Sequence, residues 1–83
     1  MQAYITAMTV NLTDIGKIIQ RHRKAAGLSQ KELADLAGIG KATVFDIEKG
    51  KETVRMVNVF KALSVLNISL ELVGPLTGKE DDR

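Results

Sequence analysis

Residues 30–49, QKELADLAGIGKATVFDIEK, decide the fold of this 83-residue chain. Two short helical stretches in this segment are separated by only three residues, the sequence GIG. Helices joined so closely can cross at a steep angle only if a small residue lies where they touch, and Ala34 is placed there. Gly38 tolerates the positive φ that such a turn requires. Val44 and Ile47, one helical turn apart, then anchor the second helix to the body and leave its opposite side to solvent.

Apolar residues recur at helical spacing on both sides of this segment as well. The four expected helices span residues 14–26, 29–37, 41–49 and 54–66. Thr13, Ser29 and Thr53 are the expected N-caps, and Ser29 with Glu32 forms a capping box. The inner face of the second helix is predicted to hold Leu33, Ala34, Leu36 and Ala37. In the fourth helix the residues that repeat at helical spacing are Met56, Val59, Phe60, Leu63 and Leu66.

The apolar period changes after Asn67, a residue that can end a helix in the left-handed conformation. Residues 68–73, ISLELV, alternate apolar and polar side chains before Gly74 and Pro75, which predicts one short strand. Residues Tyr4 to Val10 are a poor candidate for its partner. We therefore expect the same strand of a second copy to pair with it, antiparallel across a two-fold axis. The residues expected to form this dimer contact are Ile68, Leu70 and Leu72.

These patterns predict a mainly α fold, a bundle of four helices plus one short C-terminal strand that pairs across a dimer. The expected divisions are an N-terminal extension (1–12), a helical domain (13–67), a dimerisation strand (68–75) and a disordered tail (76–83). A chain of this length buries a small core, so a second subunit is the expected way to extend it. Met8 is an alternative start that would leave every motif intact.

The composition argues against an enzyme and against a cofactor or metal site. The chain has no cysteine and one histidine, His22. It has no glycine-rich phosphate loop and no clustered pair of carboxylates, and neither Ser29 nor Ser64 has a visible base. We expect no catalytic residue, no cofactor and no metal. The absence of a signal peptide pattern and of a long apolar run predicts a soluble, cytoplasmic protein with no membrane contact.

Charge is distributed unevenly along the chain. The formal net charge is +2 overall, but it is +4 over residues 14–61 and −2 over residues 68–83. A basic helical body followed by an acidic tail suits a polyanionic partner on one face.

The residues that set the turn lie at the fifth, ninth, fifteenth and eighteenth places of a twenty-residue helix-turn-helix. Around them the chain resembles the lambda-repressor-like, or Xre-type, family over residues 14–67. The residues that carry this resemblance are Gly27-Leu28-Ser29-Gln30, Leu33-Ala34, Gly38 and Ile47-Glu48-Lys49-Gly50. The stretch from Lys61-Ala62-Leu63 through residues 68–73 looks like HipB-type antitoxins, in which a short strand pairs between subunits.

The resemblance implies a set of DNA contacts. Gln30 matches a phosphate contact, Lys41 and Ala42 match positions that touch base edges, and Thr43 is placed for a phosphate or a thymine methyl. The whole implied DNA-binding set is Gln30, Lys41, Ala42, Thr43, Phe45, Asp46, Lys49 and Lys51.

Several of these positions have a second interpretation. Lys41 can read a base or bind a phosphate, and Phe45 can face DNA or fill an edge of the core. Asp46 can accept from cytosine N4 or pair with Lys49 on the helix surface. Arg23 and Glu48 match a buried structural ion pair of the family.

The function that this resemblance implies is sequence-specific transcriptional repression by a homodimer on a palindromic double-stranded DNA operator. The expected biological role is that of an autoregulating antitoxin of a HipBA-type module. The alternatives are a module that chiefly neutralises a HipA-like kinase toxin, and a stand-alone or phage-type regulator.

Overall fold

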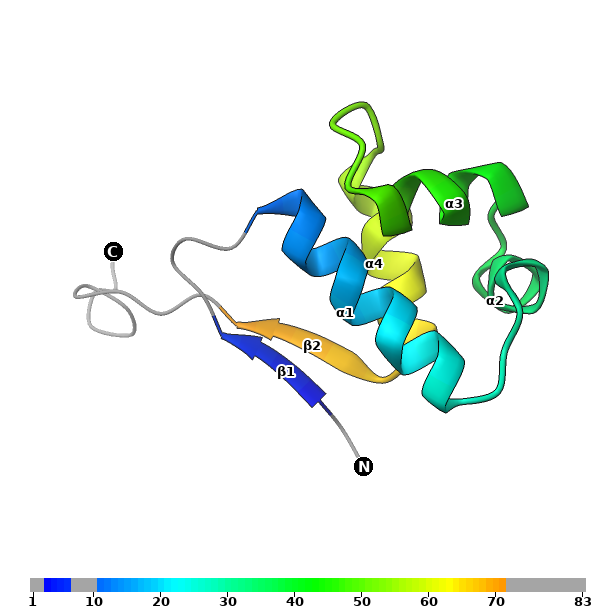
Figure 1. Ribbon diagram of the computed structural model, residues 1–83, viewed down its shortest axis with the longest axis horizontal. Coiled ribbons are helices and arrows are strands. Elements are labelled where there is room, and N and C mark those ends of the chain that lie inside the picture. Colours follow the sequence, from blue (N-terminus) through cyan, green and yellow to red (C-terminus); the bar gives the residue numbers. More distant parts are fainter. Residues whose placement is uncertain (1–2, 7–10, 72–83) are drawn as a thin grey trace, which may run out of the picture.

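A computed structural model describes residues 3–6 and 11–71 as four helices and a two-stranded sheet (Figure 1). The elements are β1 (Ala3–Thr6), α1 (Leu12–Ala25), α2 (Gln30–Ala37), α3 (Lys41–Lys49), α4 (Met56–Val65) and β2 (Ile68–Glu71). The four predicted helices are therefore confirmed, and so is the mainly α class. In Figure 1, α3 and the sheet lie on opposite sides of α1.

Side-chain caps account for where the first two helices begin. The predicted capping box of α2 is confirmed: Ser29 Oγ accepts from the Glu32 amide at 3.0 Å, and Glu32 Oε1 accepts from the Ser29 amide at 2.8 Å. The prediction that Thr13 caps α1 is wrong. Asn11 is the N-cap, and it forms a second capping box with Asp14 that extends the helix toward the N-terminus.

The fourth helix begins later than predicted. It starts at Met56 rather than Val54, and its N-cap is Arg55, which makes no side-chain capping bond. The sequence offered Thr53 as a cap, but residues 51–54 form a turn in which the Val54 amide donates to the Lys51 carbonyl at 3.3 Å. Asn67 does take the left-handed conformation, with φ 59°, and it ends α4 directly before β2.

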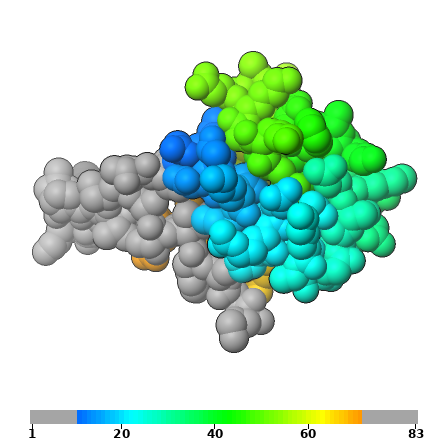
Figure 2. Space-filling view, viewed as in Figure 1, coloured from blue at the N-terminus to red at the C-terminus, as the bar shows by residue number. Residues whose placement is uncertain are grey.

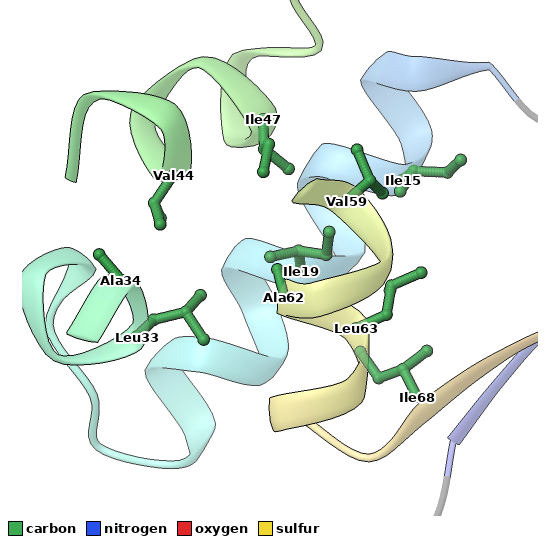
Figure 3. Close-up of a cluster of buried hydrophobic side chains, with 10 residues drawn as sticks. All are labelled: Ile15, Ile19, Leu33, Ala34, Val44, Ile47, Val59, Ala62, Leu63 and Ile68. Atoms are coloured by element: carbon green, nitrogen blue, oxygen red, sulfur yellow. The ribbon is translucent and has the colours of Figure 1, made fainter. Parts of the chain in front are cut away.

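All four helices and β2 contribute to one apolar core (Figure 3). Its buried members are Ile15, Ile19, Leu33, Ala34, Val44, Ile47, Val59, Ala62, Leu63 and Ile68. The predicted inner position of Leu36 is wrong, since that side chain is 63% exposed. At 3.6 residues per turn, Leu36 lies roughly 100° around α2 from the centre of the face formed by Leu33, Ala34 and Ala37. Met56 and Phe60 are also exposed, although both belong to the apolar repeat of α4.

The sheet corrects the expectation that β2 has no partner within the chain. β1 pairs with β2 in parallel, with Ala3 opposite Ile68 and Thr6 opposite Glu71. Parallel strands need a long crossover, and here the whole helical body from α1 to α4 provides it. The expected N-terminal extension therefore contains a strand and the first residue of α1. Leu72, the rest of the expected 68–75 segment and the expected tail lie outside the described residues.

Candidate nucleic-acid interface

The predicted helix-turn-helix geometry is present in α2 and α3. Ala34 is buried at the contact between the helices, and its carbonyl accepts from the Ile39 amide at 3.0 Å. Gly38 ends α2 with φ 71°, a left-handed conformation that favours glycine. Val44 and Ile47 point from α3 into the core (Figure 3) and are almost completely buried. One face of α3 is thus fixed to the body.

The opposite face of α3 is open to solvent. Lys41, Ala42, Phe45 and Lys49 are exposed, whereas Thr43 and Asp46 are half-buried. The N-cap of α3 is Gly40, which has no side chain to cap the first turn. In Figure 2, α3 (green) and α1 (blue to cyan) occupy the same face of the molecule. The residues predicted to meet DNA from α3 therefore lie together on an accessible surface.

Phe45 belongs to this outer surface and not to the edge of the core. Its side chain is 47% exposed, and it is absent from the core cluster. Lys49 Nζ lies 5.4 Å from the centre of the Phe45 ring, within the range of a cation–π interaction. This contact holds an aromatic face and a positive charge side by side on α3.

Asp46 does form an ion pair, but not with the expected residue. Its Oδ1 lies 3.9 Å from Lys51 Nζ, whereas Lys49 lies over Phe45. The chain turns back at Gly50, and the Lys51 amide donates to the Asp46 carbonyl at 3.1 Å, which brings Lys51 to the carboxylate. The pair is long and partly exposed, so it contributes little to stability. It does place a positive charge beside the only carboxylate on the outer face of α3.

The predicted ion pair between Arg23 and Glu48 is confirmed and buried. Arg23 Nε donates to Glu48 Oε2 at 2.6 Å, and Arg23 Nη2 donates to Oε1 at 3.1 Å. Arg23 Nη1 donates to the Leu28 carbonyl at 2.8 Å. This two-pronged geometry joins α1 to α3 and fixes the loop before α2.

Gln30 extends this network to the surface. Its Nε2 donates to Glu48 Oε1 at 3.1 Å, and its side chain is half-buried. One of the two amide N–H groups is therefore used inside the protein. The second N–H of the same amide group can donate to an external acceptor, such as the phosphate that the resemblance implies.

A hollow of about 340 Å³ opens between α1, the start of α2 and α3. It is lined by Thr13, Lys17, Gln20, Gln30, Phe45, Glu48 and Lys49. The sequence analysis missed the three residues from α1. Their spacing shows only that they share one polar side of a helix, and which side of α1 faces α3 is set by tertiary packing.

Two further observations concern metal sites and membrane-spanning helices. Among residues 3–6 and 11–71, no group of three or more His, Asp or Glu side chains is placed to hold a metal ion. None of the helices in this described part is both long enough and apolar enough to pass through a bilayer.

Comparisons with known proteins agree with this geometry. A family model described as helix-turn-helix matches residues 19–73. An uncharacterized HTH-type transcriptional regulator, y4mF of Sinorhizobium fredii, is 37% identical over 62 residues, which are 75% of this chain and 82% of that protein.

Two solved structures have the same fold. The restriction-modification controller protein C.AhdI from Aeromonas hydrophila is 37% identical, with a TM-score of 0.61, over 69% of this chain and 86% of that one. HipB, in the structure of the HipA-HipB-O2-O3 complex, is 26% identical, with a TM-score of 0.73, over 83% of this chain and 97% of the matched chain. The buried anchors of α3, its open outer face and these matches agree: the chain belongs to the lambda-repressor-like, Xre-type helix-turn-helix family of DNA-binding transcriptional regulators.

Proposed function

We propose that this protein is a sequence-specific repressor that binds a palindromic operator as a homodimer. The observation that carries the proposal is the position of α3, whose inner residues Val44 and Ile47 are buried while Lys41, Ala42 and Phe45 are exposed on one outer face. A helix held in this way can enter the major groove of B-DNA without unfolding any part of the body. Occupancy of the operator would then block transcription.

Each outer residue of α3 suits a particular kind of contact. The Lys41 ammonium can donate to guanine O6 and N7, and Ala42 can lie against a thymine methyl. Phe45 offers an apolar surface for a second methyl, and Asp46 can accept from cytosine N4. Thr43, half-buried in the first turn, is suited to a phosphate or a methyl group. The remaining members of the proposed set, Gln30, Lys49 and Lys51, would contact the phosphate backbone.

The homodimer would form through α4 and β2. Three large apolar side chains of α4, Met56, Val57 and Phe60, are exposed. Phe60 also borders a groove of about 430 Å³ that runs between α4 and β2. Contiguous exposed apolar surface of this kind marks an interaction site. In Figure 1, β2 and α3 lie on opposite sides of α1, so a partner seated along β2 would leave both recognition helices free.

Of the three predicted dimer residues, the structure describes Ile68 and Leu70, and these two differ in their surroundings. Ile68 is buried in the core of its own chain, so its side chain is not available to a partner. Leu70 is half-buried and lines the groove beside Phe60. β1 occupies one edge of β2, and the proposed antiparallel pairing with a second copy uses the other edge.

Selection from a pool of randomised duplexes, followed by footprinting of the enriched sites, tests this proposal. We expect palindromic sites with half-sites one helical turn, about 34 Å, apart, and affinity that falls steeply with salt. Lys41→Ala should reduce discrimination between related sites if Lys41 reads a base. A uniform loss across all sites would reassign Lys41 to the backbone. Failure to enrich any palindrome would refute the repressor proposal.

We further propose that the regulated gene encodes a toxin and that the protein is an autoregulating antitoxin. The likeness to HipB over 97% of the matched chain supports this role. The same likeness favours a second candidate function, direct neutralisation of a HipA-like kinase. Co-expression with the product of an adjacent kinase-like gene separates the two, because only neutralisation predicts a stable complex and restored growth with a DNA-binding-deficient variant. Without such a neighbour, a stand-alone or phage-type regulator is the remaining role.

A further inference from the structure

The hollow between α1 and α3 has the composition of an anion site. Its rim carries the ammonium groups of Lys17 and Lys49, the amide of Gln20 and the hydroxyl of Thr13. All four are donors. Lys17 is exposed, and none of the residues 3–6 and 11–71 forms an ion pair with it.

The one carboxylate that lines the hollow is already neutralised. Glu48 accepts two hydrogen bonds from Arg23 and one from Gln30, and its side chain is only 2% exposed. Because the Arg23 charge balances the Glu48 charge, the two lysines leave the hollow with a positive excess. A group bound here would meet these donors beside an ion pair that is already satisfied.

The position of the hollow identifies the anion. Phe45 and Lys49 form its α3 side, and these two residues lie on the face proposed to enter the major groove. The phosphates that border a major groove run alongside any helix inserted into it. If α3 occupies a major groove, a DNA strand that borders the groove would therefore pass over the opening between α3 and α1.

We propose that this hollow receives a backbone phosphate of the operator, held by Lys17 and Gln20 of α1 together with the free amide N–H of Gln30. This inference rests on the proposed function and extends it to Lys17 and Gln20, which neither the helix-turn-helix segment nor its resemblance assigned. The contact fixes α3 from the side of α1, while Lys51 lies beyond its C-terminal end. Two anchors on different sides would set how far α3 is rotated in the groove.

The salt dependence of binding tests the proposal. Each phosphate contact contributes about 0.9 to the slope of log K against log salt, so Lys17→Ala should lower the slope of a dimer by about 1.8. Gln20→Glu adds a negative charge to the lining of the same hollow. It should weaken binding, and the fold loss in affinity should be similar for all operator sequences. Lys61→Ala removes the same charge from α4, which does not line the hollow. It should leave the slope unchanged as long as sedimentation shows the same assembly state as the unmodified protein.

The outcomes separate this inference from the function on which it depends. If the unmodified protein binds no duplex above the non-specific level, the proposed function itself fails. If it binds a palindrome and Lys17→Ala keeps the full salt slope, the phosphate site is wrong and the repressor proposal stands. A loss that differs between operator variants would also overturn the site, because a phosphate contact carries no base information. Thermal unfolding of each variant shows whether a change in binding comes from misfolding.

Discussion

Gly16→Ala is the substitution that most directly tests how α1 is seated on α3. Gly16 is buried in α1, and a Cβ added there would lie 2.8 Å from the carbonyl oxygen of Glu48 and closer still to that of Ile47. Both obstacles are backbone atoms of α3, so neither can move aside by a change of rotamer. The two helices would have to separate.

The expected size of the effect follows from two opposing terms. Alanine is favoured over glycine inside a helix by about 1 kcal/mol. Overpacking of a rigid contact costs about 1–3 kcal/mol, and a clash with backbone belongs at the upper end. We expect a net loss of about 1–2 kcal/mol, which for a domain of this size lowers Tm by roughly 5–15 °C.

Thermal unfolding followed by circular dichroism measures this loss. Gly40→Ser is the matched control, because a Cβ at Gly40 meets only Thr43 Oγ1, at 3.8 Å, and a serine N-cap should stabilise α3 by a few tenths of a kcal/mol or leave it unchanged. A Gly16→Ala variant that melts at or above the temperature of the unmodified protein would refute the close α1–α3 contact.

Three further tests concern the buried pair, the outer face of α3 and the proposed dimer face. Arg23→Met leaves the Glu48 carboxylate buried without its countercharge, with only Gln30 still donating to it, and should cost about 3–5 kcal/mol in urea unfolding. Adding Glu48→Leu should recover most of that loss, and equal stability of the two variants would contradict this. Phe45→Ala should reduce preference for thymine at one operator position by about 1 kcal/mol in competition binding, the size of one buried methyl contact, with Tm unchanged because the side chain is exposed. Phe60→Asp should convert the proposed dimer to folded monomers in sedimentation equilibrium; a variant that remains dimeric would exclude this face.

Much of the helix-turn-helix was predictable because its determinants are local. The bounds of α3, the turn at Gly38 and the capping box at Ser29 each depend on residues a few positions apart. The start of α1 was misplaced for a local reason too: Asn11 and Thr13 are both good N-caps, and only the reciprocal bond with Asp14 favours Asn11. Choices between neighbouring caps depend on such small energy differences.

The strand β1 was not predictable from local pattern. Its partner β2 lies near the other end of the chain. Parallel strands are not joined by a hairpin turn, so the sequence contains no turn signal that would indicate the pairing. Four residues are also too few for alternation to stand out. The register, Ala3 opposite Ile68, becomes visible only when the helical body brings the two ends together.

The proposed phosphate site was missed for a related reason. Lys17 follows Gly16 directly, and the missing side chain of Gly16 is what allows α1 and α3 to touch at backbone distance. That approach brings Lys17 beside Phe45 and Lys49. The sequence shows a lysine on a polar helix face, and only the crossing of the helices shows that this face belongs to the α3 surface.

The same core that holds α3 also holds the proposed dimer face. Ile47 of α3, Val59 and Leu63 of α4 and Ile68 of β2 are members of one buried cluster, so α3 and β2 move as parts of one body (Figure 3). In a dimer joined through α4 and β2, the distance between the two recognition helices is therefore set by how these faces meet. It follows that substitutions around Phe60 that preserve the dimer should change the preferred spacing between half-sites. Substitutions on the outer face of α3 should instead change the bases preferred within each half-site.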